Sequence, residues 1–525
     1  MCQDRYRALR MKVKSITLLF LVSFFYSCIG QETKNGNYKT KRLEKAENTK
    51  NIKTVEDIFD ADAILYSTEL LPVKGERAIV SIYEYVFSRN DVENVEYEVD
   101  SAYAIETLFY EYGTLTTKKV NQEDVHQPFK AVFEKQNDGF KIIEISFGDE
   151  VELRKELPKL LKPTGNFRIG QRTFFYNKQK SGNDRLLSFQ VWYPTNLESE
   201  NKLPFRTEEV ISSVSDFLGI PNFSISYFSE IESNTILNAP TIPSKVFPVL
   251  IYNHGYGGFT QVYQTVFEDL ASHGYIIVSI GHENESALLI KENGEVIRNG
   301  PDNEFYAKRA PELSGAEIGR WQSVILNSNN IDENTEAYRK MLKLTPLHNE
   351  STNLWESDTK AVIDILEAIN NEGEELAGIF DFDRIGIFGH SLGGATAGQM
   401  CFGNTPIKAG INLDGFQFGD LFSNKLEVPF MFVSSNQEGD RYLRAFTFIK
   451  NSKQDCYQIS IEGFSHDNFT DLKYIIEGDK EAMELQRTLV RVFFDKYLKD
   501  KPINLKGLER EYERISFDFS IVKDD

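Results

Sequence analysis

A buried-strand pattern that runs directly into a glycine-rich turn with one serine constrains the fold of this chain more than any other feature. The strand pattern RIGIF covers residues 384–388, the turn GHSLGG covers residues 389–394, and a helical pattern begins at Ser391. The glycines permit a tight turn, which strains Ser391 and projects it from the sheet. This combination predicts an α/β fold with Ser391 at one edge of its sheet.

Strand and helix patterns alternate on both sides of this turn. Alternation requires crossover connections, so it predicts a doubly wound, mostly parallel sheet that is covered on both faces. Two insertions, at residues 196–244 and 282–353, interrupt the alternation and should emerge near the edge that carries Ser391. We place this domain at residues 163–520. Its strand patterns lie at 173–176, 186–193, 247–252, 275–280, 384–388, 409–413, 430–433 and 457–461, and its helix patterns at 260–272, 354–370, 391–400 and 481–497.

An aromatic, strand-rich segment at residues 53–150 predicts a smaller α+β domain. Residues 75–89 have helical apolar spacing, and the last two strand patterns are joined by NDG at 137–139, which tolerates the positive φ of a hairpin. The segments DADAILYSTELLPVKGERAIVSIYEYVF and FKAVFEKQNDGFKIIEIS resemble the NTF2-like family, in particular its SnoaL-like branch. That resemblance implies helices against a curved antiparallel sheet. Residues 150–163 should form an interdomain helix.

The first 30 residues have the layout of a signal peptide. Two lysines precede an apolar stretch at residues 16–26, which is too short to cross a bilayer of roughly 30 Å as a helix. The junction before Cys28 resembles a bacterial lipoprotein signal, in which the cysteine is lipidated, and an ordinary cleaved signal is the alternative. We therefore expect an exported, membrane-anchored lipoprotein, periplasmic or on the cell surface. Residues 31–52 should form a linker that is either a tether or a weak helix.

Composition excludes some partners and cofactors. The formal net charge is -20, and no long basic run is interleaved with aromatic residues, so we expect no nucleic-acid partner. The sequence contains neither a HExxH helix nor paired CxxC motifs, so we expect no metal and no cofactor. Cys401 and Cys456 are the cysteines of the mature chain, and we favour two unpaired buried thiols over a disulfide.

Ser391 needs a base to become nucleophilic, because its hydroxyl keeps its proton at neutral pH. His466 is the only histidine downstream of Ser391, and it directly follows the strand pattern YQISIEG. The side chain of His390 should point away from that of Ser391. The remaining histidines precede the turn, which fits poorly with the chain order serine, acid, histidine. We therefore predict His466 as the base and His390 as structural.

The acid that orients His466 is open to two interpretations. Asp414 follows the strand pattern AGINL, one element after the strand of Ser391, whereas Glu438 and Asp440 follow the next strand pattern. Position at a strand end cannot choose between them.

A second glycine-rich turn, NHGYGG at residues 253–258, ends the strand pattern FPVLIY. Glycines let the backbone approach a substrate and turn an N–H group toward it. Together with the helix start after Ser391, this turn predicts that the N–H groups of Tyr256 and Leu392 bind an oxyanion.

Five segments together resemble the plasma-type platelet-activating-factor acetylhydrolases, a branch of the α/β-hydrolases: VWYPT, YNHGYGGF, FGHSLGGAT, INLDGF and GFSHDNFTD. They are spread over residues 165–500. The resemblance implies a catalytic triad of Ser391, Asp414 and His466, so it favours Asp414 over Asp440. It also implies a short-acyl or phospholipid ester as substrate, although the two insertions depart from a minimal hydrolase.

The sequence as a whole predicts a serine-dependent carboxylic ester hydrolase that works through an acyl-enzyme. Two alternatives stay open at this point. The protein could be a non-catalytic ligand-binding lipoprotein that uses the smaller domain, or a serine hydrolase that cleaves peptide or thioester bonds with the same triad.

Overall fold

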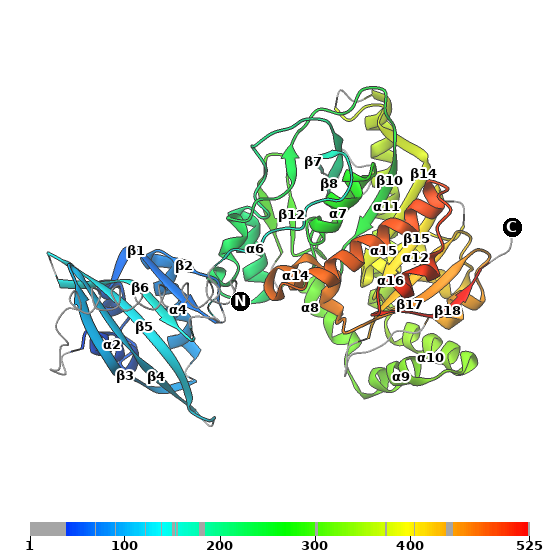
Figure 1. Cartoon of the computed structure of the whole chain (residues 1–525). Helices are drawn as coiled ribbons and strands as arrows, with labels where there is room; N and C mark the ends of the chain where they lie inside the picture. The colour runs from blue at the N-terminus through cyan, green and yellow to red at the C-terminus, as the bar shows by residue number, and fades with distance from the viewer. Residues whose placement is uncertain are drawn as a thin grey trace, which may run out of the picture. The chain divides into compact units, whose positions relative to one another are not determined.

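The structure is a computed structural model of the whole chain (Figure 1). It describes residues 38–68, 70–89, 91–120, 122–137, 139–149, 153, 156–177, 184–299, 303–372, 375–403, 405–436 and 445–522. The chain divides into an N-terminal unit, Met1–Leu157 with Pro221–Tyr227, and a C-terminal unit, Pro158–Ile220 with Phe228–Asp525. The predicted signal peptide and Cys28 lie outside the described residues.

The N-terminal unit is a twisted, mostly antiparallel sheet with helices packed on it (Figure 1). Its described strands follow the order β2-β1-β6-β5-β4-β3, and the hairpin of β5 and β6 is where the NDG turn predicts it. The helix predicted at residues 75–89 is α4, whose Ile79, Val80 and Tyr83 are buried. The bounds are α2 Thr40–Asn48, α3 Ile52–Ile58, β1 Phe59–Ser67, β2 Val73–Lys74, α4 Glu76–Arg89, β3 Val92–Ile105, β4 Leu108–Lys119, β5 Val125–Gln136 and β6 Gly139–Phe147.

The linker predicted at residues 31–52, as a tether or a weak helix, contains the helix α2, and α2 belongs to the folded N-terminal unit. Leu43 and Ala46 of α2 lie in its hydrophobic core. A buried carboxylate, Glu111 of β4, accepts hydrogen bonds from the N–H groups of Lys39 (2.7 Å) and Thr40 (3.0 Å) at the start of the helix. These N–H groups have no partner within the helix, so an acid from a distant strand caps it.

The C-terminal unit is built on a large, mostly parallel sheet, as predicted. Its described strands follow the order β18-β17-β16-β15-β14-β10-β11-β8-β7-β9. The strands from β11 through β10, β14, β15 and β16 to β17 are parallel, and β8 and β18 join them antiparallel. All residues of β10 and β11 are buried, which requires helices on both faces of the sheet. The strand bounds are β7 Arg168–Tyr176, β8 Leu187–Thr195, β9 Thr235–Leu237, β10 Phe247–Asn253, β11 Ile276–His282, β14 Phe380–His390, β15 Ile407–Leu413, β16 Phe430–Asn436, β17 Cys456–Glu462 and β18 Ile515–Ile521.

The helices of this unit pack partly on one another and partly on the sheet (Figure 1). Helix α7 packs on α15, and α11 packs on α12, which also contacts β10, β14 and β15. The core helices are α7 Gln264–Ser272, α11 Pro346–Glu372, α12 Leu392–Gln399, α13 Phe446–Lys450, α14 Asp471–Glu477, α15 Lys480–Leu498 and α16 Leu508–Glu511.

Both predicted insertions fold into defined elements. The first holds α6 Glu208–Leu218 and β9, while its residues Pro221–Tyr227 group with the N-terminal unit, where Phe223 packs edge-on against Tyr85. The second holds β12 Leu288–Ile290, β13 Val296–Arg298, α8 Glu304–Arg309, α9 Ala316–Asn327 and α10 Ile331–Leu344, and it ends inside α11.

Two smaller predictions have different outcomes. Residues 156–163 form no helix, so the described part of the predicted interdomain helix is wrong; Pro158 and Pro163 both remove backbone donors there. Cys401 and Cys456 are free and buried in the core of the C-terminal unit, as favoured from the sequence. Burial raises the pKa of both thiols.

Candidate active site

Ser391 lies on a strained turn between β14 and α12. Its φ of 55° and ψ of -120° are rare for a residue with a side chain. Its N–H group donates to the carbonyl of Leu413 (2.9 Å), and its own carbonyl accepts from the N–H group of Gly394 (2.9 Å). A Cβ atom on Gly389 would lie 2.2 Å from the carbonyl oxygen of Gly393. The turn therefore requires glycine at position 389, as the motif predicts.

Asp414 follows β15, the strand next to that of Ser391. Its φ is 54°, and its side chain is 4% exposed. The carboxylate accepts hydrogen bonds from the N–H group of Ser435 (2.8 Å) and from its hydroxyl (3.0 Å). These donors fix the carboxylate and leave Oδ2 in contact with the next member of the site.

His466 begins the short helix η5 His466–Phe469, directly after β17. Ser465 and Asn468 form a capping box that fixes this turn. The Nδ1 atom of His466 lies 2.7 Å from Oδ2 of Asp414. An ionised carboxylate can only accept hydrogen bonds, so Nδ1–H of His466 donates to Asp414. Nε2 is therefore left as the basic nitrogen of the ring. The imidazole is half exposed, so solvent and small molecules reach it.

Backbone contacts bring the three residues to one place. A Cβ atom on Gly415, directly after Asp414, would lie 2.1 Å from the carbonyl oxygen of Ser391. The ring of His390, directly before Ser391, lies 4.4 Å from the ring of His466. The structure thus brings Ser391, Asp414 and His466 together at the carboxyl ends of β14, β15 and β17. Glu438 and Asp440, the alternative acids, lie outside the described residues.

The turn NHGYGG reaches the same place from β10. A Cβ atom on Gly255 would lie 3.3 Å from Cβ of Ser391 and 3.0 Å from Nδ1 of His390. Glycine is therefore needed for the turn to approach the serine. Tyr256 follows this point of closest approach, and Leu392 is the first residue of α12, whose N–H groups at the start have no acceptor within the helix.

Contacts from the second insertion hold this turn. The N–H group of Gly257 donates to the carbonyl of Glu285 (2.9 Å), and the N–H group of Ala287 donates to the carbonyl of Gly258 (2.8 Å). The imidazole of His254 lies 2.7 Å from the hydroxyl of Ser286.

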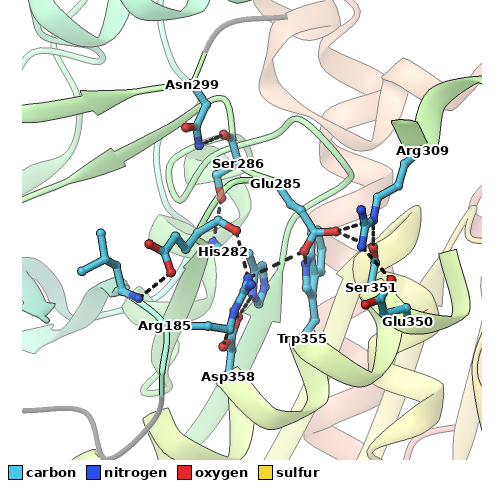
Figure 2. Close-up of polar contacts among 12 residues, drawn as sticks. Arg185, His282, Glu285, Ser286, Asn299, Arg309, Glu350, Ser351, Trp355 and Asp358 are labelled. Atoms are coloured by element: carbon cyan, nitrogen blue, oxygen red, sulfur yellow. Dashed lines mark hydrogen bonds and ion pairs between the residues drawn. The ribbon is translucent and has the colours of Figure 1, made fainter. Parts of the chain in front are cut away.

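Figure 2 shows the buried polar network behind these contacts. The Glu285 carboxylate is fully buried; it accepts from the indole N–H of Trp355 (2.8 Å) and from the hydroxyl of Ser351, and it lies 3.5 Å from Arg309. Asp358 accepts from Arg185 (2.9 Å) and contacts His282 (3.0 Å). The sequence analysis did not identify this network, because its members are spread over residues 185–358 without a motif.

Four of the histidines that precede Ser391 are buried within the protein: His254, His282, His348 and His390. Burial, with His282 nearby, lowers the pKa of His254 to about 3, and burial lowers the pKa values of His282, His348 and His390 as well. A histidine that stays neutral in the core is a packing and hydrogen-bonding residue. His390 is also buried, which agrees with the prediction that it is structural.

An apolar cluster lies next to the serine turn. Trp355, Leu392, Ala395 and Phe418 form its buried part, and Tyr256 packs against it with its ring stacked on Trp355 at 6.5 Å. Trp355 gave no sequence signal beyond its place in a helical pattern.

No described helix has the length and apolar character needed to span a bilayer. Within the same residues, no group of three or more His, Cys, Asp and Glu side chains is arranged to hold a metal ion.

Comparison with known proteins places the chain in a family. The family described as platelet-activating factor acetylhydrolase, isoform II, matches residues 154–479. Platelet-activating factor acetylhydrolase from Cavia porcellus is 24% identical over 353 residues, which cover 62% of this chain and 74% of that protein. The protein of the same name from Canis lupus familiaris is 25% identical over 338 residues, covering 60% of this chain and 69% of that protein.

A solved structure agrees on the fold. Ferulic acid esterase from Streptomyces cinnamoneus matches with a TM-score of 0.50 and 18% identity, covering 69% of this chain and 100% of that chain. At this identity the likeness shows the fold alone. The match over residues 154–479 covers more than half of the chain, so this protein belongs to the platelet-activating factor acetylhydrolase, isoform II, family.

Proposed function

We propose that this protein is a serine-dependent carboxylic ester hydrolase with Ser391 as nucleophile, His466 as base and Asp414 as acid. The observation that carries the proposal is the 2.7 Å contact between Asp414 and His466 beside the strained turn of Ser391. A histidine oriented by a buried carboxylate, next to a serine on such a turn, is the arrangement that activates a hydroxyl.

The proposed reaction has two steps. His466 Nε2 takes the proton of Ser391 as its oxygen attacks the ester carbonyl, and the alcohol leaves with that proton. Water then attacks the acyl-enzyme with His466 again as base, which releases the acid and restores the serine. Asp414 stabilises the imidazolium in both steps. The N–H groups of Tyr256 and Leu392 would bind the oxyanion, each contributing about 2.7 to 4 kcal/mol in comparable enzymes.

The proposed substrates are short-acyl or lipid esters. The family is named for an acetylhydrolase, and the partly exposed ring of Tyr256, which packs on the buried cluster of Trp355 and Phe418, is an apolar group near the serine. We also propose that the chain is exported and that Cys28 is lipidated, which would bring it to a membrane surface. Metabolic labelling with palmitate tests the anchor: Cys28→Ala should abolish the label.

A fluorophosphonate probe and a substrate panel test the catalytic proposal. The wild-type chain should be labelled at Ser391, and Ser391→Ala should lose both the label and the hydrolysis of p-nitrophenyl acetate. Ser357→Ala, a serine in the middle of α11, is the matched control. A folded wild-type chain without a probe adduct would favour a ligand-binding protein. Faster cleavage of peptide or thioester substrates than of p-nitrophenyl esters would favour the other alternative.

A further inference from the structure

The N-terminal unit contains a cavity of about 350 Å³ that the proposed hydrolysis does not use. This volume lies within the range of small-molecule sites. The walls come from α2, α4 and the sheet, and their apolar part includes aliphatic and aromatic side chains: Leu65, Leu70, Ile82, Val86, Phe87, Val95, Leu115 and Phe147. All residues that line the cavity belong to the N-terminal unit.

One carboxyl group lies in the wall of this cavity between two tyrosines. Glu47, in the last turn of α2, accepts a hydrogen bond from the hydroxyl of Tyr97 (2.8 Å) and is also hydrogen-bonded by Tyr83. Tyr97 is 1% exposed and Tyr83 is 7% exposed. Burial is the main reason that the pKa of Glu47 rises from 4.5 to about 7.

The charged groups around Glu47 come from several elements. Glu44 on the same helix raises the pKa of Glu47 slightly, whereas the hydroxyls of Tyr97 on β3 and Tyr83 on α4 lower it. Lys50 after α2, Glu93 on β3 and Lys119 on β4 also line the cavity. Lys50 and Glu93 are exposed, while Lys119 is half-buried.

A carboxyl group in this position costs stability, because a desolvated charge is unfavourable and a glutamine of the same shape would keep a hydrogen bond to tyrosine. Titratable groups that are perturbed inside a cavity are often functional. An ammonium group would compensate the carboxylate, and the apolar walls would take an attached hydrocarbon. We propose that this cavity binds a small organic amine, with its ammonium group on Glu47 and its apolar part between α4 and the sheet.

Binding of an amine should depend on pH in a defined direction. The ammonium group pairs with the ionised form of Glu47, and this form decreases as the pH falls below about 7. Affinity should therefore weaken as the pH falls from 8 to 5, by up to about tenfold per pH unit. A neutral alcohol of the same shape should bind with little dependence on pH.

Calorimetric titration of the full chain with 4-phenylbutylamine and 4-phenylbutan-1-ol tests the proposal. At pH 8 the amine should bind at least about tenfold more tightly than the alcohol, as expected for a charge-assisted hydrogen bond. Glu47→Gln should remove this preference and the pH dependence. Glu96→Gln, which changes an exposed carboxyl group on β3 outside the cavity lining, should retain both.

Thr117→Trp, which fills the cavity, should abolish binding of both compounds and keeps the test valid if Glu47→Gln does not fold. Equal affinities for amine and alcohol, an unchanged Glu47→Gln variant, or no binding at millimolar concentration would each overturn the proposal. The Ser391→Ala chain should bind the amine as the wild type does, so failure of the proposed hydrolysis leaves this result unaffected.

Discussion

Two residues of the candidate site, Ser391 and Asp414, have φ angles of 55° and 54°. Such backbone costs of the order of 1–3 kcal/mol per residue, and it persists where the surrounding structure enforces it. Here the enforcing contacts are the hydrogen bonds from the N–H groups of Ser391 to Leu413 and of Asp414 to Val433. Neighbouring strands therefore fix both residues in the conformation that points them to one edge of the sheet.

Asp414→Asn removes the charge of the acid and keeps the positive φ of the backbone. Asparagine tolerates positive φ well, so the fold should be kept. The loss of the carboxylate should decrease kcat for p-nitrophenyl acetate by about 10⁴-fold, because the imidazolium loses its partner and the imidazole its correct tautomer. Asp467→Asn, at the exposed neighbour of His466, is the control and should stay near wild type. Nearly intact turnover of Asp414→Asn would transfer the role to another acid, first of all Asp440.

Among the secondary-structure elements, the site depends on how closely the backbones of β10, β14 and α12 approach one another. The start of α12 touches the end of β10, since a Cβ atom on Gly393 would lie 2.0 Å from the carbonyl oxygen of Asn253. This contact sets the distance between the turn of Tyr256 and the turn of Ser391. Small side chains at these crossings are therefore requirements of the site.

Gly393→Ala should displace the two turns from each other. A shift of about 1 Å in a catalytic group can decrease the rate by about 100-fold, so we expect a loss of this size in kcat/KM with p-nitrophenyl acetate. Gly319→Ala is the matched control, because its Cβ atom would meet nothing within 4 Å near the start of α9. That variant should keep full activity and gain about 0.4 to 1 kcal/mol in unfolding free energy. Wild-type kinetics of Gly393→Ala would refute the close contact.

Glu285→Gln tests the network behind the turn of Tyr256. The substitution removes the buried charge between Arg309 and Arg185. It also places an N–H₂ donor where an oxygen of Glu285 now accepts a hydrogen bond. Loss of one member of a buried ionic network costs about 3 kcal/mol, which urea unfolding would measure. We also expect a lower kcat, since the carbonyl of Glu285 holds the N–H group of Gly257. Glu295→Gln, in an exposed ion pair with Lys291, should leave both quantities unchanged.

At the scale of the whole molecule, the N-terminal and C-terminal units have separate hydrophobic cores. Separate cores unfold as separate cooperative units when few contacts join them. We therefore expect differential scanning calorimetry to resolve two transitions. A single transition whose calorimetric and van't Hoff enthalpies agree would show that the units unfold together.

The pH dependence of one transition should identify the N-terminal unit. The pKa of Glu47 is about 7 in the folded chain, above its ordinary value of 4.5, so the folded state holds the extra proton between these pH values. Unfolding free energy then falls as the pH rises through this window, by at most about 1.4 kcal/mol per pH unit. Glu47→Gln should remove this contribution from one transition and leave the other unchanged. A shift in both or in neither would contradict the assignment.

The sequence alone predicted the main alternation of strands and helices in the C-terminal unit, the turn of Ser391 and the glycines around it. It did not predict β18, α14 or α16. These features are local, because alternating periodicity and a tight turn are set by neighbouring residues. His466 could also be chosen from chain order. The hairpin of β5 and β6 and helix α4 were predictable for the same reason.

The residues alone left the choice of acid open, and the family resemblance favoured Asp414. The contact between Asp414 and His466 itself comes from the tertiary structure, because the two residues are 52 positions apart. The place of α2 in the folded N-terminal unit was not predicted, because its cap, Glu111, comes from 71 residues further along the chain. The network of Glu285 and the cavity of Glu47 gave no motif for the same physical reason. Burial changes the pKa of a carboxyl group through neighbours that folding assembles, and local sequence does not encode which neighbours those are.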